Sequence, residues 1–441
     1  MTAVKKIFLS VFVNKNFLKL WLAQILSQSS VNILTFVLAI SAYNATKSNG
    51  AVSYVIISFG VAALIFGAPA GVIVDYLDNK KTLVWSIILR ALFILILLFA
   101  TNNLLVTVAL AFILNSITQF FFPAEASAIP LIVKRGDLLS ANSIYSMTYF
   151  IAQIIGFVSA GFLLEMLQFN FTIVFLTILF LISAYLVYTI NFPPSEKIKL
   201  NLSKLSDQVI LEFKKGISYI KRHNNVKLPI YYLALSQVLT GTLLTLLPGY
   251  AVEVLGLKVE QTSLYLVAPV AVGMVIGSIY LNRFGKKLNR DKIVNIGFIG
   301  GFISLAMLSV IHRVGFEMFS RNIQISKNLP FAYNTFLGVD LLFFSILFMG
   351  CAGLFNAFII IVNNTRLQSK TEEKMRGRIY GVLQTGVTIA AFLPILLAGH
   401  LADVFGINKI IFAIALLMLM AYAVVKPRHA DHRSTTVNRP F

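Results

Sequence analysis

Cysteine and charge are both scarce in this chain of 441 residues. Its single cysteine, Cys351, excludes a disulfide within the chain and argues against a cysteine-based metal site. Charged residues make up 12% of the sequence, whereas soluble domains carry about 25%. The 17 acidic residues are outnumbered by 37 lysines and arginines. Composition alone therefore excludes an ordinary soluble domain.

Motifs for catalysis and nucleotide binding are missing as well. The pair Gly285–Lys286 lacks the earlier glycine spacing and the following Ser or Thr of a phosphate-binding loop. We therefore predict that the protein is not an enzyme, with no catalytic residues, no cofactor and no metal site. Without a nucleotide site, the energy for any transport must come from an ion or solute gradient, or from a partner protein.

Apolar sequence is what the chain has in abundance. Hydrophobic residues make up 58% of it, and its mean hydropathy is +0.83. Apolar segments of about 20 residues span a bilayer as helices, because lipid cannot satisfy the free backbone groups of open strands. The predicted spans are residues 17–42, 51–75, 82–101, 103–124, 141–166, 170–191, 229–252, 261–282, 292–312, 335–362, 378–402 and 406–425.

The distribution of the cations predicts the orientation of these spans. With the N-terminus in the cytoplasm, six of the 37 lysines and arginines fall in outside loops and 30 fall on the cytoplasmic side. Basic residues placed in this way face anionic lipid, so the net charge of +20 does not indicate nucleic-acid binding. We predict a monomeric, multi-pass protein of the bacterial cytoplasmic (inner) membrane, with both termini cytoplasmic. Membrane lipids are expected partners, and nucleic acid is not.

Two pairs of similar segments indicate an internal duplication. GVIVDYLDNKK (71–81) returns in altered form as GSIYLNRFGKK (277–287). IAQIIGFVSAGFLLEML (151–167) aligns without gaps with IAAFLPILLAGHLADVF (389–405). Two related six-helix halves with a solute site at their interface form a known transporter architecture. The predicted fold is therefore all-α and polytopic, with 12 transmembrane helices in two pseudo-symmetric six-helix bundles.

The domain boundaries follow from these halves. The two copies lie further apart in the second repeat pair than in the first, so the second half contains extra residues. We assign these residues to the outside segment 313–334. The segment is either an outer cap or short interfacial helix, or an insertion without a role. Part of the linker, about 205–220, is expected to form an amphipathic helix on the inner membrane surface. The predicted parts are an N-terminal bundle (1–191), a cytoplasmic linker (192–228), a C-terminal bundle (229–426) and a basic cytoplasmic tail (427–441).

The turn GVIVDYLDNKK also predicts a gate on the cytoplasmic side. Asp75 lies at the inner end of the second span, where it can face the N-terminus of a helix from the other half. The start of span eleven, KMRGRIYG (374–381), offers such a helix start together with cations. The alternative is a charged turn that only sets topology. Arg90, inside the third span, either reaches the inner surface or pairs with Asp75. The candidate gating residues are Gly71, Asp75, Lys80, Lys81, Arg90, Arg376 and Arg378.

The same turn carries a family resemblance. GVIVDYLDNKK resembles the loop 2–3 signature of the major facilitator superfamily, although Asp78 or Asn79 stands where the family usually has glycine. Residues 121–164 resemble the efflux branch that includes enterobactin-type siderophore exporters and macrolide efflux permeases. The resemblance implies export of a siderophore-like or drug-like solute. Phe157 follows Gly156 where many antiporters have proline, and Asn32 stands where this branch often has aspartate.

In that fold the solute cavity is lined mainly by spans one, four, seven and ten, and each of these carries polar residues. In span one they recur four residues apart, which places them on one helical face. Such amides and hydroxyls suit a solute with several hydrogen-bonding groups, and the alternative is packing between helices. The candidate substrate-binding residues are Gln24, Gln28, Asn32, Asn115, Gln119, Gln237, Thr245 and Asn356.

Acidic residues inside the spans are candidates for proton coupling. Asp340 lies inside span ten, and apolar surroundings favour the protonated form that a proton carrier requires. Glu125, Glu165 and Asp403 lie near predicted span ends and are expected to be solvated or to cap helices.

These features predict a secondary active transporter that exports a small organic solute by alternating access, with protons as the coupling partner. One alternative is a lysophospholipid flippase or an importer of a small solute. A third interpretation is a non-transporting membrane scaffold or receptor. The intact first turn and the polar face of span one argue against that interpretation.

Overall fold

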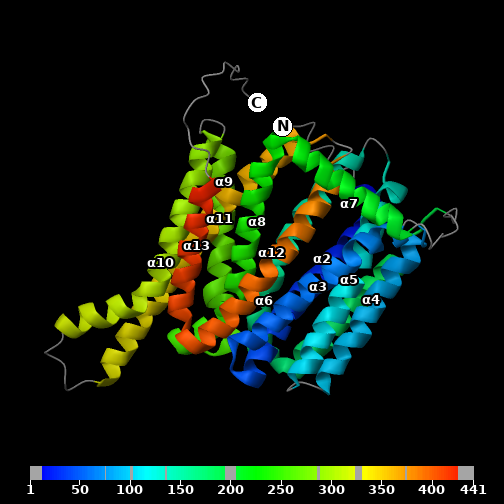
Figure 1. The fold of residues 1–441 in the computed structure, drawn as a ribbon. Helices are drawn as coiled ribbons and strands as arrows, with labels where there is room; N and C mark the ends of the chain where they lie inside the picture. The colour runs from blue at the N-terminus through cyan, green and yellow to red at the C-terminus, as the bar shows by residue number, and fades with distance from the viewer. Residues whose placement is uncertain are drawn as a thin grey trace, which may run out of the picture.

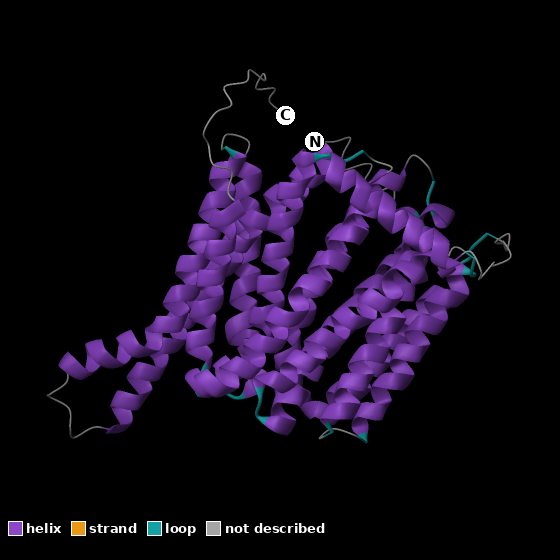
Figure 2. Ribbon diagram, viewed as in Figure 1, coloured by secondary structure: helices purple, strands orange, loops and turns teal. Residues whose placement is uncertain are grey.

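The computed structural model describes residues 12–74, 76–99, 103–134, 137–193, 205–285, 289–322, 330–372 and 375–425. Regular structure within these ranges is helical throughout (Figure 2). Eleven helices are long and apolar enough to cross a membrane. One of them, α6 (Leu138–Tyr188), contains two predicted spans, because its backbone leaves the helical conformation at Gln168. The predicted all-helical, twelve-span architecture is therefore confirmed.

Five long helices form the N-terminal bundle. Side-chain caps start several of them: the Asn14 carboxamide accepts hydrogen bonds from two backbone N–H groups of α2, and Asp78 accepts one from α4. Within the bundle, α2 packs on α6, and both α3 and α4 pack on α5. The bundle consists of α2 (Lys15–Thr46), α3 (Asn49–Val74), α4 (Asn79–Leu95) with the short η1 (Ile96–Leu98), α5 (Leu104–Ile132) and α6.

The C-terminal bundle repeats this plan. α10 packs on α11 and α13, and α11 also packs on α8 and α9. Two seams join the bundles: α12 lies along α3, and α6 contacts η6 and the start of α9. The bundle consists of α8 (Asn224–Gly249), η4 (Tyr250–Val254), η5 (Val259–Gln261), η6 (Ser263–Val267), α9 (Ala268–Phe284), α10 (Arg290–Asn322), α11 (Pro330–Lys370), α12 (Arg376–Phe405) and α13 (Ile407–Val425).

The linker contains the expected helix. α7 (Leu205–Arg222) lies across one end of the molecule and packs against α3, α8 and α12 (Figure 1). Lys214, Lys215 and the last-turn Lys221 and Arg222 are exposed on it. The start of α2 and the end of α13 lie at the same end of the molecule (Figure 1). We call this the inner end, and the opposite end the outer end.

Two helices extend beyond the bundle at the outer end. α10 continues to Asn322 and α11 begins at Pro330, so the described backbone of the 313–334 region lengthens these two helices (Figure 1). The described part of this region does not form the separate short helix that we considered. At the corresponding place in the N-terminal bundle, η1 ends at Leu98 and α5 begins at Leu104, capped by Asn103.

Candidate functional site

The outer end holds the strongest polar contacts between the bundles. Asp403, in the last turn of α12, accepts hydrogen bonds from the backbone N–H groups of Asn49 (2.8 Å) and Gly50 (3.0 Å) at the start of α3. It also accepts one from the Ser48 hydroxyl at 2.5 Å. A carboxylate from one bundle therefore caps a helix of the other, where exposed amides and the helix dipole favour negative charge. The prediction that Asp403 caps a helix is confirmed.

The second seam is related to the first by the sequence repeat. Glu165 of α6, which aligns with Asp403, accepts a hydrogen bond from the Gln261 carboxamide at 3.3 Å. The Ser263 hydroxyl accepts a hydrogen bond from the Gly161 N–H (2.8 Å) and donates one to the Val158 carbonyl (3.2 Å). Repeat-equivalent positions in the two bundles therefore both contact the opposite bundle.

Two aligned glycines allow this close approach. A Cβ atom on Gly161 would lie 1.9 Å from the Glu260 carbonyl oxygen, and one on Gly399 would lie 2.0 Å from the Ser53 hydroxyl. Real Cβ atoms do not come so close to other atoms. The absence of a side chain at both positions lets α6 and α12 reach the facing helices. We call Asp403, Glu165, Gly161, Gly399 and their partners the outer seal.

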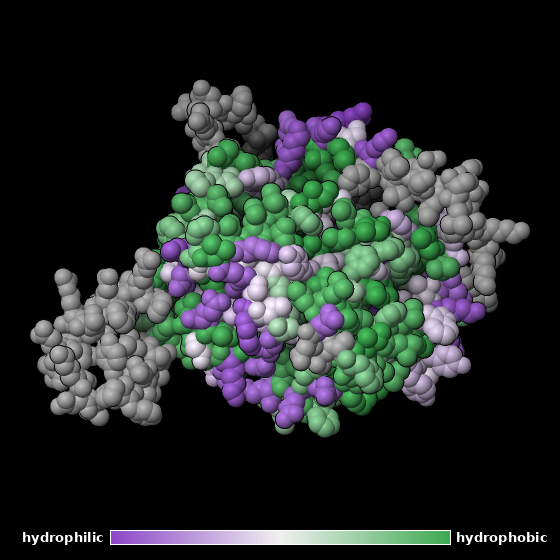
Figure 3. Space-filling model, turned by 60° about the horizontal axis from the view of Figure 1, so that its bottom comes forward, coloured by the Kyte–Doolittle hydropathy of each residue, from purple (hydrophilic) through white to green (hydrophobic). Residues whose placement is uncertain are grey.

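Further hydrogen bonds surround the outer seal. Tyr43 donates to Glu253 across the bundles at 3.2 Å, and Tyr54 contacts a ring nitrogen of His400 at 3.0 Å. Figure 3 looks toward the outer end and shows hydrophilic side chains gathered on this face between apolar flanks. Asp403 itself remains exposed to solvent, so the seal lies at the surface of the molecule.

Toward the inner end the contacts between the described parts of the two bundles become fewer. The Ser53 hydroxyl donates to the Ile395 carbonyl at 3.1 Å, and a Cβ on Gly60 would meet Thr388 at 3.0 Å. Every described hydrogen bond between the two bundles lies on the outer side of Gly60. The structure is therefore closed at the outer end. Asp75 lies outside the described residues, as do the side chains of Arg376 and Arg378, so the inner clasp stays a prediction.

The polar face of α2 is buried within its own bundle. Gln24, which is 2% exposed, donates to the Tyr145 carbonyl of α6 at 3.2 Å. Gln28 and Asn32 are buried as well, and a Cβ on Gly156 of α6 would lie 2.5 Å from the Asn32 Cβ. In this structure Gln24 and Asn32 therefore pack against α6 of the same bundle, as the alternative of packing between helices predicts.

The candidates on α5 are half-buried. Asn115 donates to the carbonyl one turn earlier and, with Thr35 and Arg90, lines a cavity of about 10 Å³, which has room for at most one water molecule. Gln119 lies close to Gly67 of α3, because a Cβ there would be 3.5 Å from its carboxamide oxygen.

The candidates on α8 and α11 are only partly brought together. Asn356 of α11 accepts a hydrogen bond from the Ser236 hydroxyl (2.6 Å) and donates to Thr240 (3.4 Å), both on α8. Gln237 is exposed, whereas Thr245 is buried and bonded to the Gly241 carbonyl. Ser236 and Thr240 were not predicted, although both lie within one turn of Gln237 on α8.

Arg90, one of the predicted gating residues, is buried inside the N-terminal bundle. Its guanidinium is 2% exposed, donates to the Ser27 hydroxyl at 3.0 Å and stacks 4.4 Å from the Phe121 ring centroid. Its Nε and Nη2 atoms have no hydrogen-bond partner among the described residues. Arg90 does not reach the inner surface, because helices α2 and α5 of its own bundle enclose it.

Glu125 was predicted to be solvated or to cap a helix, and this prediction is wrong. The fourth span was expected to end at residue 124, but α5 continues through Pro123 and Pro130 to Ile132. Glu125 therefore lies about two turns inside the helix, 4% exposed. It interacts electrostatically with Arg90 of α4 and with Tyr145 and Tyr149 of α6, and its Oε1 has no hydrogen-bond partner among the described residues.

The remaining gating candidates lie near the inner end of the N-terminal bundle. Lys80 donates to the Ile190 carbonyl at 2.9 Å and lies over the Tyr188 ring, so it ties α4 to the end of α6 rather than to the other bundle. Lys81 borders a cavity beside α4, and a Cβ on Gly71 would meet nothing within 4 Å. The side chain of Asp340, the proposed proton carrier, lies outside the described residues.

Two six-helix membrane bundles that meet through polar contacts at one end have the architecture of a secondary transporter. Residues 20–320 match the family model described as Major Facilitator Superfamily. The chain belongs to this superfamily of membrane transporters and is not an enzyme.

The relatives found by sequence are bacterial. YkuC of Bacillus subtilis (strain 168), named as a transporter of the same superfamily, is 24% identical over 314 residues, which cover 67% of this chain and 71% of YkuC. BacE of the same organism, named as a candidate bacilysin exporter, is 25% identical over 233 residues, 52% of this chain and 56% of BacE.

Solved structures share the fold. The nucleoside transporter NupG has a TM-score of 0.66 at 12% identity, covering 93% of this chain and 98% of that one. A bacterial homologue of the iron transporter ferroportin has a TM-score of 0.65 at 14% identity, covering 93% and 98%.

Proposed function

We propose that this protein exports a small organic solute by alternating access. The observation that carries the proposal is the outer seal, in which aligned residues of two related bundles each contact the opposite bundle. Every hydrogen bond between the described parts of the bundles lies toward this end. Contacts that consist of a few hydrogen bonds at the surface can break while each bundle stays packed. Opening of the outer end with closure of the inner end, where Asp75 and KMRGRIYG are expected to meet, completes the cycle.

Two observations favour the outward direction. Residues 121–164 resemble the efflux branch described above, and the similarity to BacE links this chain to a protein named for export. The polar groups of α8 and α11, around Gln237, Thr240 and Asn356, supply hydrogen-bonding capacity for the solute. Siderophore-like and drug-like molecules are the solutes that the resemblance implies.

Glu125 is the carboxyl group that we assign to proton coupling, with Asp340 as the second candidate. It lies in an apolar bundle between a buried arginine and two tyrosines, and one of its oxygens is unpartnered among the described residues. Intramembrane acids of this kind serve as proton relays in transporters. Arg90 is the cation that compensates the charged form, so loss or gain of one proton changes the electrostatic balance among α4, α5 and α6.

The test begins with identification of the solute. Metabolites inside and outside cells are compared between a deletion strain and an overexpressing strain, and an exported solute accumulates inside the deletion strain. Uptake of that solute is then measured in inside-out membrane vesicles with and without an imposed pH gradient. Uptake that ignores the gradient would remove the antiport proposal, and a solute that accumulates outside the deletion strain would reverse the direction.

A lysophospholipid flippase remains the second candidate, because lipid transport can use the same alternating access between two bundles. A flippase predicts that labelled lysophospholipid crosses the bilayer of reconstituted liposomes only when the protein is present. An importer of a small solute uses the same fold, and the deletion-strain comparison distinguishes it.

A further inference from the structure

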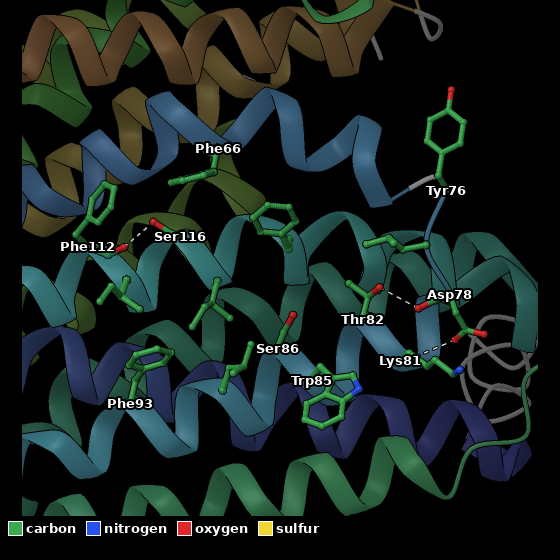
Figure 4. A pocket seen from close by; sticks show the side chains of 15 residues that line it. Phe66, Tyr76, Asp78, Lys81, Thr82, Trp85, Ser86, Phe93, Phe112 and Ser116 are labelled. Atoms are coloured by element: carbon green, nitrogen blue, oxygen red, sulfur yellow. Dashed lines mark hydrogen bonds between the residues drawn. The ribbon is translucent and has the colours of Figure 1, made fainter. Parts of the chain in front are cut away.

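A cavity of about 800 Å³ lies between α3, α4 and α5 of the N-terminal bundle (Figure 4). It exists because α3 and α4 both pack against α5 but hardly against each other. No described residue of the C-terminal bundle, of α2 or of α6 lines it. The cavity, which we call the lateral groove, is therefore separate from the interface between the bundles.

The walls of the lateral groove are aromatic and aliphatic. The Phe66 ring of α3 lies 6.2 Å from the Phe112 ring and 6.1 Å from the Phe120 ring, both on α5. Trp85 of α4 is 59% exposed at its edge. Exposed apolar side chains of a membrane protein face lipid tails, so this groove is filled by hydrocarbon rather than by water.

One end of the lateral groove is polar. Asp78, Lys81 and Thr82 gather at the inner end of α4, whereas Phe93 lies at the opposite end (Figure 4). The Asp78 carboxylate accepts a hydrogen bond from the Lys81 backbone as a helix cap. The Lys81 ammonium has no hydrogen bond or ion pair among the described residues, and the neighbouring Lys80 adds a second positive charge. The rim therefore offers cations to an anionic group.

The length of the groove fits one leaflet of the membrane. Lys81 and Phe93 are 12 positions apart on α4, which corresponds to about 18 Å along the helix axis. Half of the hydrocarbon core is about 15 Å thick. A molecule with its phosphate at Lys81 and one tail along Phe66, Trp85 and Phe120 would span the inner leaflet.

We infer that the lateral groove is a binding site for a phospholipid of the inner leaflet, with the phosphate at Lys81 and one acyl chain between α3, α4 and α5. The lipid is a resident ligand rather than cargo, because the groove does not reach the bundle interface. It wedges between the inner ends of α3 and α4, next to the segment Tyr76–Asp78. The inference does not depend on the solute, and it stands whether the protein exports or imports.

The test uses the full-length protein purified in detergent and native mass spectrometry with added dioleoyl phosphatidylglycerol, phosphatidylethanolamine or diacylglycerol. We expect both phospholipids to bind wild type and diacylglycerol to bind at least about tenfold more weakly, because it lacks the phosphate. Lys81→Gln should weaken phospholipid binding about tenfold. Lys409→Gln, which removes an exposed lysine at the outer end, should leave it unchanged.

A groove-filling variant tests the acyl-chain part. Ser116 lines the groove on α5, and its hydroxyl bonds to the carbonyl of the preceding turn (Figure 4). Ser116→Phe should abolish phospholipid binding, and its thermal melting without lipid shows that it is folded. Equal binding of phospholipid by wild type, Lys81→Gln and Ser116→Phe would overturn the inference. Equal binding of diacylglycerol and phospholipid by wild type would overturn the role of the phosphate.

Discussion

Glu125 is held inside the N-terminal bundle by side chains from two neighbouring helices. Arg90 on α4 supplies the opposite charge, and Tyr145 and Tyr149 on α6 supply hydroxyl groups. Because neither charged group reaches solvent, each depends on the other for compensation. Changes at Glu125 and at Arg90 should therefore have different effects: the first on proton movement and the second on the stability of the bundle.

Proton coupling should be lost when Glu125 can no longer ionise. Glu125→Gln keeps the size of the side chain but removes its exchangeable acid proton. We expect solute-driven proton movement in inside-out vesicles, followed with a pH-sensitive dye, to fall to background. Glu372→Gln, an exposed acid near the inner end, is the control and should behave as wild type. Normal coupling in Glu125→Gln would move the assignment to another acid, with Asp340 next.

Removal of Arg90 alone should destabilise the bundle. Arg90→Met leaves Glu125 without its cation and breaks the bond to Ser27, at a cost of roughly 2 kcal/mol for the unsatisfied group. Arg90→Met combined with Glu125→Gln removes both charges and should cost less than the sum of the single changes. Thermal unfolding in detergent measures both. Strict additivity would show that the two side chains do not interact.

At the scale of the elements, α6 and α12 perform the same task in the two bundles. Gly161 and Gly399, which the repeat aligns, each bring a helix against the opposite bundle. The aligned acids Glu165 and Asp403 follow one turn later and contact the start of the facing segment. The sequence repeat is therefore visible as a repeated contact between helices.

Gly399→Ala should open the outer seal. The added methyl group would overlap the Ser53 hydroxyl and the Asn49 carbonyl, so α12 must move away from α3. In a Cys351→Ser background, a cysteine placed at Asn44 should then react faster with a membrane-impermeant maleimide added outside. Gly386→Ala is the matched control on the same helix, since a Cβ there meets nothing within 4 Å. Equal labelling rates in the two variants would contradict the seal.

The two acids should contribute unequally to the seal. Asp403 accepts bonds from two backbone amides and two side chains of the facing helix start, whereas Glu165 accepts one from Gln261. Replacement of a capping side chain by alanine costs about 1 kcal/mol, so Asp403→Ala should shift the equilibrium toward the outward-open form by about fivefold. Glu165→Ala should shift it less. The same labelling assay ranks the two variants. Faster labelling of the Glu165 variant than of the Asp403 variant would show that the cap on α3 is not the main contribution to the seal.

The sequence predicted the elements better than the directions in which their side chains point. Apolar length predicted all twelve spans. The repeat aligned Gly161 with Gly399 and Glu165 with Asp403, but it did not predict that these residues contact the opposite bundle. Glu125 was misplaced because α5 passes through two prolines, which a hydropathy pattern does not reveal. The polar face of α2 was recognised, but only the neighbouring α6 shows that Gln24 and Asn32 pack against a helix. The hydrophobic periodicity of one helix shows which of its side chains share a face, but not which neighbouring helix that face contacts.

On the scale of the whole molecule, opening at the outer end must be reversible for transport. A disulfide between cysteines introduced at Asn49 and Asp403, whose side chains approach within 3.0 Å, should lock the seal in a Cys351→Ser background. We expect transport to fall to background on oxidation and to recover on reduction. The single variants serve as controls. Full transport by completely cross-linked protein would exclude alternating access through this end.

The bend at Gln168 has a mechanical consequence for the molecule. The first arm of α6 carries Gly161 at the outer seal, and the second arm binds α2 through Ser183 and Lys19 near its far end. The Thr172 hydroxyl, which follows the bend, donates to the Leu163 carbonyl of the first arm and to the carbonyl of Gln168 at the bend. α6 therefore links the opposite bundle at the outer end to α2 toward the inner end. Separation of the bundles at the outer end is expected to move α2 at the inner end as well.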